Sequence, residues 1–393
     1  MKILFITNQF NPPRSSGSGN SSSLIFHQLK DRGHEVDLLI FDDEKYKKRY
    51  RETRYGEDYR ERKYLATIEE LSKISDGDYD IIHQYGGAPA KYILPVLGKD
   101  FEYTKIVTTF NGIYPACWNY EGYGRNDRRC CRFPKNFRCI KKSYEGKNPL
   151  FLPFLYMIRK TQKRLAKKFD KIFTQSEAIK VLFSKSGYNT SKIEIVPNFY
   201  DPSLYDSIRK QDVKESDKIK ITYVGKIEEH KGIDDLVQAF LRLEDENVEL
   251  RIIGKGTEKK KLEDRYSKKD EIKFLGKIPY ASSRLIKSYK ESDIFVHPGL
   301  WPEPFNRTIL EAAVSKNAII VSDVGAPPEV LEESALTYPP GEVEGLSAKL
   351  KRLIDDGEKR EELAEKSHDL VIGEYSIGDA IDELEKEYKK LLV

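Results

Sequence analysis

Short apolar runs alternate with stretches of helical periodicity along the whole chain. In the first half, runs rich in Ile, Leu, Val and Phe, bounded by polar or Gly/Pro-containing segments, predict buried strands. These strands are expected at residues 3–6, 35–41, 80–83, 105–109, 171–174 and 193–196. A Gly/Ser-rich loop follows the first strand, and a helix is expected near residues 22–32. Strands that alternate with helices predict a sheet covered by helices on both faces.

The same pattern restarts in the second half of the chain. Further strands are expected at residues 219–224, 249–253, 272–275, 294–297 and 318–321. The sequence Pro-Asn-Phe-Tyr-Asp-Pro at 197–202 breaks the pattern between the two series. A chain of 393 residues is also too long for one ordinary core. We therefore predict an α/β protein with two doubly wound, Rossmann-like domains, residues 1–200 and 201–374.

Net charge and hydropathy restrict the expected partners and the expected cellular location of the protein. The formal net charge is only +4, and no recognised nucleic-acid motif accompanies the basic loops, so nucleic acid is not an expected partner. Basic residues gather at 125–147 and 159–171, where an anionic acceptor or a membrane surface could dock. The first strand turns polar too soon for a signal peptide, and no run of 18 apolar residues follows, so a cytoplasmic location is expected.

An apolar patch at residues 148–158 runs into a basic helix expected at 160–171. Such a segment suits peripheral contact with the inner face of a membrane. It equally suits an ordinary core helix with a basic outer face, and the sequence leaves both interpretations open.

All four cysteines lie in the interruption at residues 111–150, at Cys117, Cys130, Cys131 and Cys139. Thiols in a cytosolic loop suggest a metal before a disulfide. The spacing lacks the CxxC pairs of common zinc sites, and the adjacent Cys130 and Cys131 ligate one ion awkwardly. A structural metal, a disulfide and free thiols therefore all stay open.

Two carboxylates stand eight residues apart after the strand expected at 294–297. Glu303 lies in a Pro-rich loop beside Trp301 and Phe305, and Glu311 lies within the first turns of a helix that begins near Arg307. A pair of Glu at this spacing more often marks a solvated helix face. However, open α/β sheets bind ligands outside the carboxyl ends of their strands, facing a helix N-terminus that suits a phosphate. Carboxylates there can grip sugar hydroxyls through charge-assisted hydrogen bonds.

The segment Glu303-Pro-Phe-Asn-Arg-Thr-Ile-Leu-Glu311-Ala resembles the E-P-F-G-x-x-x-L-E-A motif of the retaining GT-B glycosyltransferases of family 4. The next loop, residues 322–329, is also similar to its counterpart in that family. The resemblance implies the GT-B fold, in which two Rossmann-like domains face a cleft. It further implies that a C-terminal helix, residues 375–393, packs back on the first domain.

This resemblance implies transfer of a sugar, with retention, from a nucleotide-diphosphate sugar to a glycan or polyprenyl-linked acceptor. Glu303 would hold the donor sugar, Lys231 the diphosphate, and Asn111 would face the sugar where similar enzymes commonly have His. The other donor-binding residues implied are Gly17, Gly19, Gly225, Lys226, Gly276, Ile278, Phe305, Asn306, Arg307 and Glu311. The second domain would bind the nucleotide sugar, and the first would shape the acceptor side. No cofactor and no catalytic metal are expected, because lysines and a helix N-terminus take the place of the cation.

Asn111 departs from the family pattern in a way that bears on mechanism, because Asn cannot titrate. It excludes a general-base role at that position, which a front-face transfer does not require. Two other functions stay open as alternatives. One is a sugar-nucleotide isomerase on this fold, against which the motif around Glu303 and Glu311 speaks. The other is a non-catalytic subunit that binds sugar nucleotides, which Asn111 allows.

Overall fold

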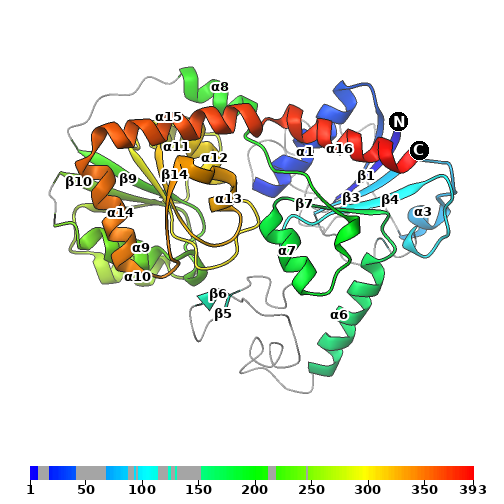
Figure 1. Cartoon of the computed structure of the whole chain (residues 1–393), viewed down its shortest axis with the longest axis horizontal. Coiled ribbons are helices and arrows are strands. Elements are labelled where there is room, and N and C mark those ends of the chain that lie inside the picture. The colour runs from blue at the N-terminus through cyan, green and yellow to red at the C-terminus, as the bar shows by residue number, and fades with distance from the viewer. Residues whose placement is uncertain are drawn as a thin grey trace. The chain divides into compact units, whose positions relative to one another are not determined.

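The computed structural model describes residues 1–7, 17–40, 68–86, 93, 96–113, 123–124, 129–130, 152–210, 218–244 and 247–393. The chain forms two compact units, shown with their elements in Figure 1. The first unit comprises residues 1–120, 133–197 and 378–393, and the second comprises 121–132 and 198–377. Each unit is built on one six-stranded parallel sheet, so the predicted two-domain α/β fold is confirmed.

The first sheet has the strand order β2-β1-β3-β4-β7-β8. Its strands are β1 (Lys2–Thr7), β2 (Glu35–Ile40), β3 (Ile81–Tyr85), β4 (Lys105–Thr109), β7 (Lys171–Thr174) and β8 (Ile193–Ile195). Among the described residues, the helices of this unit include α1 (Gly17–Asp31), α3 (Ile68–Lys73), α6 (Leu152–Ala166), α7 (Glu177–Lys185) and α16 (Ile377–Leu392), with a 3-10 turn η3 (Thr190–Lys192). The middle of β1 (Ile3–Ile6) is fully apolar, as expected for a strand of a parallel sheet that helices cover on both faces.

The first helix begins at Gly17, five residues earlier than the sequence predicts. Gly17 and Gly19 therefore lie in the first turn of α1 and not in a loop before it. Gly and Ser have low helix propensity, which is why local pattern places the start later. Ser22 is fully buried, as are Ile25 and Leu29 on the same helix, so packing against the sheet extends the helix beyond what propensity alone supports.

The C-terminal helix α16 packs on the first unit through buried polar contacts. The hydroxyl of Tyr388 lies 2.5 Å from Nδ1 of His83, which is completely buried in β3. Glu387, also buried, pairs with Lys171 at 3.1 Å. These contacts join the end of the chain to the middle of the first sheet.

The second sheet has the strand order β11-β10-β9-β12-β13-β14. Its strands are β9 (Ile219–Val224), β10 (Val248–Ile253), β11 (Ile272–Gly276), β12 (Ile294–His297), β13 (Ala318–Ser322) and β14 (Ala335–Tyr338). The helices are α8 (Pro202–Lys210), α9 (Ile233–Leu241), α10 (Lys259–Tyr266), α11 (Ser283–Lys290), α12 (Arg307–Val314), α13 (Pro327–Leu331), α14 (Val343–Asp355) and α15 (Gly357–Glu374), with 3-10 turns η4 (Glu229–Lys231) and η5 (Glu332–Ser334). The strand β14 is not predicted from the sequence, because this edge strand has only four residues and its apolar run is too short to stand out.

Alternate residues of β12 show how this sheet is buried on both faces. Ile294 and Val296 pack in the core formed with α9 and α14. Phe295, between them, packs in the opposite core with α11 and α12. Because successive side chains of a strand point to opposite faces, an unbroken apolar run places hydrophobic groups in both cores.

The topology of the second sheet defines where its ligands can bind. Its strand order is the 3-2-1-4-5-6 order of a doubly wound sheet, and the order reverses between β9 and β12. In such sheets ligands bind beyond the carboxyl ends of the strands at this switch point. The loops that leave β9 and β12 are therefore the place to look for a site.

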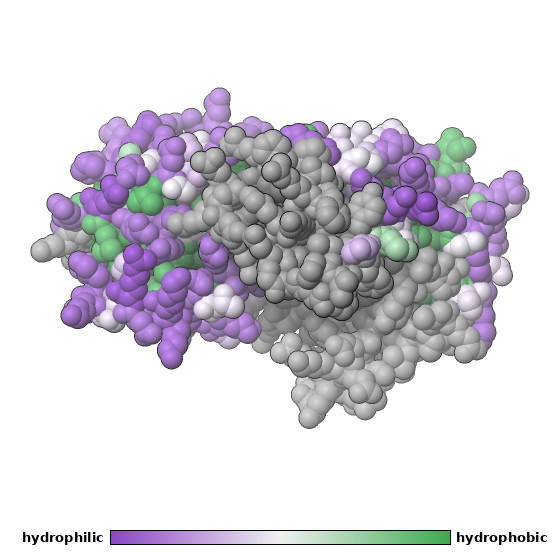
Figure 2. Space-filling model, turned by 90° about the horizontal axis from the view of Figure 1, so that it is seen from below, coloured by the Kyte–Doolittle hydropathy of each residue, from purple (hydrophilic) through white to green (hydrophobic). Residues whose placement is uncertain are grey.

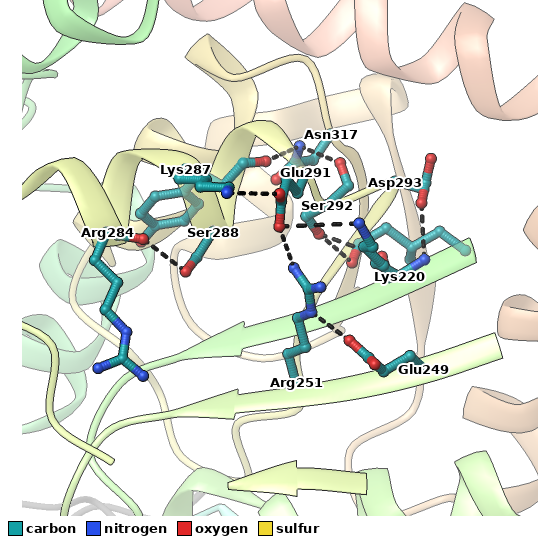
Figure 3. A network of polar contacts seen from close by, with 12 residues as sticks. Lys220, Glu249, Arg251, Arg284, Lys287, Ser288, Glu291, Ser292, Asp293 and Asn317 are labelled. Atoms are coloured by element: carbon teal, nitrogen blue, oxygen red, sulfur yellow. Dashed lines mark hydrogen bonds and ion pairs between the residues drawn. The ribbon is translucent and has the colours of Figure 1, made fainter. Parts of the chain in front are cut away.

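A polar network lies at the opposite edge of the second sheet, near the amino ends of its strands (Figure 3). Glu291, at the end of α11, accepts a 2.8 Å hydrogen bond from Arg251 and lies 3.9 Å from the ammonium of Lys220. The Asp293 carboxylate accepts the backbone N–H of Lys220 at 2.7 Å. Burial opposes ionisation of Glu291, but Arg251 and Lys220 outweigh it and hold the pKa of Glu291 below its usual value. The network ties β9, β10 and β12 together.

The described surface is mainly polar in the view of Figure 2, where hydrophobic residues form small separate groups. A cavity of 670 Å³ lies near the amino edge of the second sheet, lined in part by Arg209, Lys290 and Arg360. None of the predicted donor-binding residues lines it. No helix within the described ranges is long and apolar enough to cross a membrane.

Candidate active site

The loop after β12 holds Glu303 in a tightly fixed backbone. The N–H of Glu303 donates to the carbonyl of Trp301 at 2.8 Å, and its carbonyl accepts the N–H of Ala326 at 2.9 Å. Gly325 has φ of +76°, and a Cβ there would lie 2.4 Å from the nitrogen of Glu303. Only glycine fits this approach, so the segment after β13 locks the position of Glu303.

The carboxylate of Glu303 meets donors from two loops at its Oε2 atom. Lys231 forms an ion pair with this oxygen, and the indole Nε1 of Trp301 donates to it at 2.7 Å. His297 Nε2 lies 3.8 Å away. Burial opposes ionisation of Glu303, but Lys231, with His297 and Trp301, overcomes it and holds the pKa of Glu303 below its usual value. Glu303 is therefore a carboxylate at neutral pH.

Lys231 reaches Glu303 because the loops after β9 and β12 are joined. The N–H of Leu300 donates to the carbonyl of His230 at 2.9 Å. Gly232 has φ of +70°, and a Cβ there would lie 2.0 Å from the carbonyl oxygen of Pro298. The Lys231 ammonium also lies 4.6 Å from the ring centre of Trp301, a cation–π distance. The two predicted groups thus meet at the switch point.

Glu311 lies in the second turn of α12 and is 5% exposed. The hydroxyl of Tyr289 donates to its Oε2 at 2.7 Å. Burial raises the pKa of Glu311, an effect that Arg307 and the Tyr289 hydrogen bond only partly offset. The guanidinium of Arg307 donates to the hydroxyl of Tyr280 at 2.9 Å, and that hydroxyl donates to the Asp201 carboxylate at 3.0 Å.

Asn306 joins the start of α12 to β12. Its φ of +72° is unusual for a residue other than glycine. Its Oδ1 caps the helix by accepting the N–H of Thr308 at 3.0 Å, and its Nδ2 lies 2.6 Å from Nδ1 of His297. Burial lowers the pKa of His297 to about 4. His297 is not among the site residues predicted from the sequence. The signal that could have found it is a polar residue at the end of a buried strand, at the edge of the sheet where ligands bind.

Close backbone contacts mark the carboxyl ends of β9, β10 and β11. A Cβ on Gly225 would lie 2.5 Å from the hydroxyl of Tyr223, and Gly254 donates its N–H to the carbonyl of Gly276 at 2.9 Å. The side chain of Lys226 is exposed and forms no hydrogen bond or ion pair with any described residue. Ile278, just beyond β11, is buried.

Phe305 completes the loop between β12 and α12. It is buried, and its ring centre lies 5.7 Å from that of Tyr375 in an edge-on contact. This contact anchors the loop to the end of α15, so the backbone that carries Glu303 is held on a second side.

Asn111 belongs to the first unit, as do Gly17 and Gly19, whereas the other predicted donor-binding residues belong to the second. Asn111 follows β4, and its Oδ1 accepts a 3.2 Å hydrogen bond from Gln175. Its Nδ2 is buried without a hydrogen-bond partner among the described residues. A buried amide N–H in this state is ready to donate to a ligand oxygen.

The predicted cysteine site lies almost wholly outside the described residues. Cys117, Cys131 and Cys139 are outside them, and Cys130 lies in β6 (Arg129–Cys130), which pairs with β5 (Tyr123–Gly124). Within the described ranges no cluster of His, Cys, Asp and Glu is arranged to hold a metal ion.

Comparisons with known proteins agree with this fold. Residues 16–204 match the family described as Glycosyltransferase Family 4, and residues 205–369 match Glycosyl transferases group 1. An uncharacterized glycosyltransferase of Methanocaldococcus jannaschii is 23% identical over 99% of this chain and 98% of its own. The lipopolysaccharide 1,2-N-acetylglucosaminetransferase of Salmonella typhimurium is 25% identical over 64% of this chain and 70% of its own.

Solved structures resemble the chain over its full length. Anabaena HepE in complex with UDP covers 99% of this chain and 100% of HepE, with a TM-score of 0.72 at 17% identity. The HepE complex with UDP-glucose has a TM-score of 0.69, with 16% identity and the same coverage. These matches define a two-domain GT-B fold. With the two consecutive family matches, they show that the chain belongs to the GT-B glycosyltransferases of group 1.

Proposed function

We propose that the protein is a retaining glycosyltransferase that moves a sugar from a nucleoside-diphosphate sugar to a glycan or lipid-linked acceptor. The observation that carries this proposal is the pairing of Lys231 with Glu303 at the switch point of the second sheet. One loop supplies a cation suited to a diphosphate, and the next supplies a carboxylate suited to sugar hydroxyls. The HepE complexes with UDP and UDP-glucose support the same donor class and make UDP-sugars the first donors to test.

The chemistry follows from the charges of these groups. The bond between the sugar C1 and the diphosphate oxygen breaks while the acceptor hydroxyl oxygen bonds to C1 on the same face. The acceptor proton passes to the departing diphosphate oxygen, so Asn111 need not titrate. Glu303, kept ionised by its neighbours, stabilises the positive charge that develops at C1. Lys231 and Lys226 stabilise the negative charge of the leaving diphosphate.

In this proposal the nucleoside binds beside the second turn of α12, which carries Glu311. Glu311 accepts hydrogen bonds from the ribose hydroxyls, and Tyr289 orients its carboxylate through the 2.7 Å hydrogen bond. The backbone after β11, at Gly276 and Ile278, meets the base. Recognition by backbone groups leaves few side chains that would distinguish one base from another.

The proposal is tested by thermal-shift titration with UDP, GDP, ADP, dTDP and their common sugar conjugates. Stabilisation by one nucleotide series is expected, followed by transfer with that sugar to an acceptor and a product of unchanged anomeric configuration by NMR. If the protein binds the sugar nucleotide but neither transfers the sugar nor slowly hydrolyses the donor, a non-catalytic binding subunit would be favoured. Conversion of the donor without any acceptor would favour an isomerase. No binding at all would refute the proposal.

A lipid-linked acceptor would place the protein at a membrane, and α6 offers a surface for that contact. Met157 is 66% exposed on this helix, and Lys160 and Arg164 are exposed near it at helical spacing. An apolar side chain flanked by basic ones suits an anionic bilayer. Co-sedimentation with anionic but not neutral liposomes at low salt is expected, and Met157→Asp should reduce it. Equal sedimentation with both lipid types, or with neither, would count against membrane contact.

A further inference from the structure

One nitrogen of the His297 ring is buried and makes no hydrogen bond with any residue that the structure describes. His297 is 3% exposed, and its Nε2 has no hydrogen-bond partner in the part of the chain that the structure describes. Oε2 of Glu303 lies 3.8 Å from this nitrogen, which is beyond hydrogen-bonding range. A buried polar group without a partner is costly, so the site is built for a state in which Nε2 is satisfied.

Asn306 determines which nitrogen of this ring carries the proton. Because Oδ1 of Asn306 accepts the N–H of Thr308, its amide cannot flip without losing the cap of α12. Nδ2 therefore faces Nδ1 of His297, 2.6 Å away, and donates to it. The neutral ring must then carry its proton on Nε2, the nitrogen that faces Glu303. Burial keeps the ring neutral near pH 7, because it lowers the pKa of His297 to about 4.

Asn306 is also a departure from the motif that this segment resembles. The motif E-P-F-G has glycine at this position, and φ of +72° is a conformation that glycine adopts freely. Asn tolerates that conformation less well, but its side chain adds both the helix cap and the contact with His297. Asn306 thus adopts a strained backbone conformation, and the same residue fixes the tautomer of His297.

We propose that His297, locked by Asn306 with its proton on Nε2, replaces Lys231 as the hydrogen-bond donor to Glu303 when Lys231 turns to the donor diphosphate. This inference rests on the proposed function, because it requires a diphosphate that competes with Glu303 for Lys231. In the structure, Lys231 and Glu303 satisfy each other, and the sugar nucleotide must separate them. His297 keeps the carboxylate ionised and oriented after that separation, and so acts as a positioning residue.

The geometry permits this exchange with little movement. Closing the gap between Nε2 and Oε2 from 3.8 Å to hydrogen-bonding range requires a shift of about 1 Å. Gly299 leaves the space beside the ring open, since a Cβ there would lie 2.8 Å from Nε2. Trp301 already donates to the same carboxylate oxygen and need not move for the exchange.

The test is a two-bond 1H–15N NMR spectrum of protein labelled in its histidines, with and without saturating UDP, or whichever nucleoside diphosphate the thermal titration selects. The signals of His297 are assigned by their loss in His297→Gln. In the ligand-free wild-type protein we expect His297 to be the Nε2–H tautomer. The resonance of its Nε2–H proton should shift downfield when the diphosphate is added. In Asn306→Gly, which restores the motif residue and fits the backbone, the Nδ1–H tautomer should become populated.

Affinity for the sugar nucleotide supplies a second, matched measurement. His297→Leu, which removes the donor, should weaken binding by roughly tenfold or more, as loss of a hydrogen bond to a charged group does. His297→Gln keeps an N–H near the position of Nε2 and should restore most of that loss. Melting temperatures of both variants without ligand show whether the fold is intact.

The outcomes separate this inference from the function on which it rests. If wild type binds the diphosphate but the Nε2–H signal does not move, the exchange is wrong and the proposed function stands. Equal affinities of the Leu and Gln variants would overturn the exchange as well. If wild type binds no nucleoside diphosphate, the proposed function fails, and the exchange fails with it.

Discussion

The ammonium of Lys231 pairs with the carboxylate of Glu303 across 72 positions of sequence. The contact exists because β9 and β12 lie side by side at the centre of the second sheet, so the loops that follow them leave the same edge together. Each side chain is about seven-eighths buried, and each neutralises the other. In the proposed reaction the Lys231 and Glu303 side chains must both turn to the substrate. In the free protein each therefore blocks the group of the other that would bind the substrate.

Replacing Glu303 should separate diphosphate binding from catalysis. Glu303→Gln releases Lys231, so UDP, which lacks the sugar, should bind at least as tightly as to wild type. Turnover should fall by about 100-fold or more, because the carboxylate no longer stabilises charge at C1. Isothermal titration with UDP and initial rates with the matching UDP-sugar measure the two effects.

The matched variant for this test is Lys231→Met, which keeps the length of the side chain and removes its charge. It should weaken UDP binding and slow turnover together. If Glu303→Gln also weakened UDP binding to the same extent, the two residues would act as one structural unit, and the interpretation that each blocks the other in the free protein would be wrong.

Glu311 should determine affinity for the nucleoside. Glu311→Gln removes a charged acceptor, and UDP binding should weaken by about 1–3 kcal/mol, the usual loss for a hydrogen bond to a charged group. Tyr289→Phe removes only the hydroxyl that orients the carboxylate, so its effect should be smaller and in the same direction. Titration calorimetry with UDP and with uridine measures both, and unchanged affinity in Glu311→Gln would remove this residue from the site.

The network at the amino edge of the second sheet should contribute to stability without affecting function. Glu291→Gln leaves Arg251 and Lys220 without their shared anion, and should lower the free energy of unfolding of the second unit by about 1–3 kcal/mol. Hydrogen exchange of peptides from β9 and β10 measures that loss. UDP affinity should not change, because the site lies at the opposite edge of the sheet; a change would show that the two edges are coupled.

Acid should destabilise the first unit through His83. Burial lowers the pKa of this ring to about 3 in the folded state, against an ordinary value near 6.5. Below pH 6.5 His83 therefore binds a proton in the unfolded chain but stays neutral in the folded chain. The free energy of unfolding consequently falls as the pH falls. Between pH 7 and pH 5 this group accounts for about 2 kcal/mol of lost stability.

His83→Gln should abolish that part of the pH dependence, as measured by hydrogen exchange of β3 and β4 at the two pH values. Tyr388→Phe provides the matched control, since it removes a hydrogen-bond partner of His83 but leaves the titrating ring. It should be less stable at both pH values with the wild-type slope. A wild-type slope in His83→Gln would assign the acid sensitivity to other groups.

Much of the fold follows directly from local pattern. The strands β4, β7, β9 and β12 have the bounds predicted from the sequence, because strands buried on both faces concentrate hydrophobic residues in short segments. Local pattern failed where packing outweighs propensity, as at the start of α1. It failed again at β14, where a short edge strand depends on its neighbour more than on its own residues.

The sequence by itself determined the two series of strands, the motif around Glu303 and Glu311, and the residues that could meet a diphosphate and a sugar. It could not show that Lys231 contacts Glu303, that Tyr289 donates to Glu311, or that a buried nitrogen of His297 has no hydrogen-bond partner among the described residues. These relationships depend on which strands lie next to each other and on how closely glycines let their loops approach. Periodicity acts over a few residues, whereas a site at a switch point is assembled from segments far apart in the chain, so only the tertiary structure decides it.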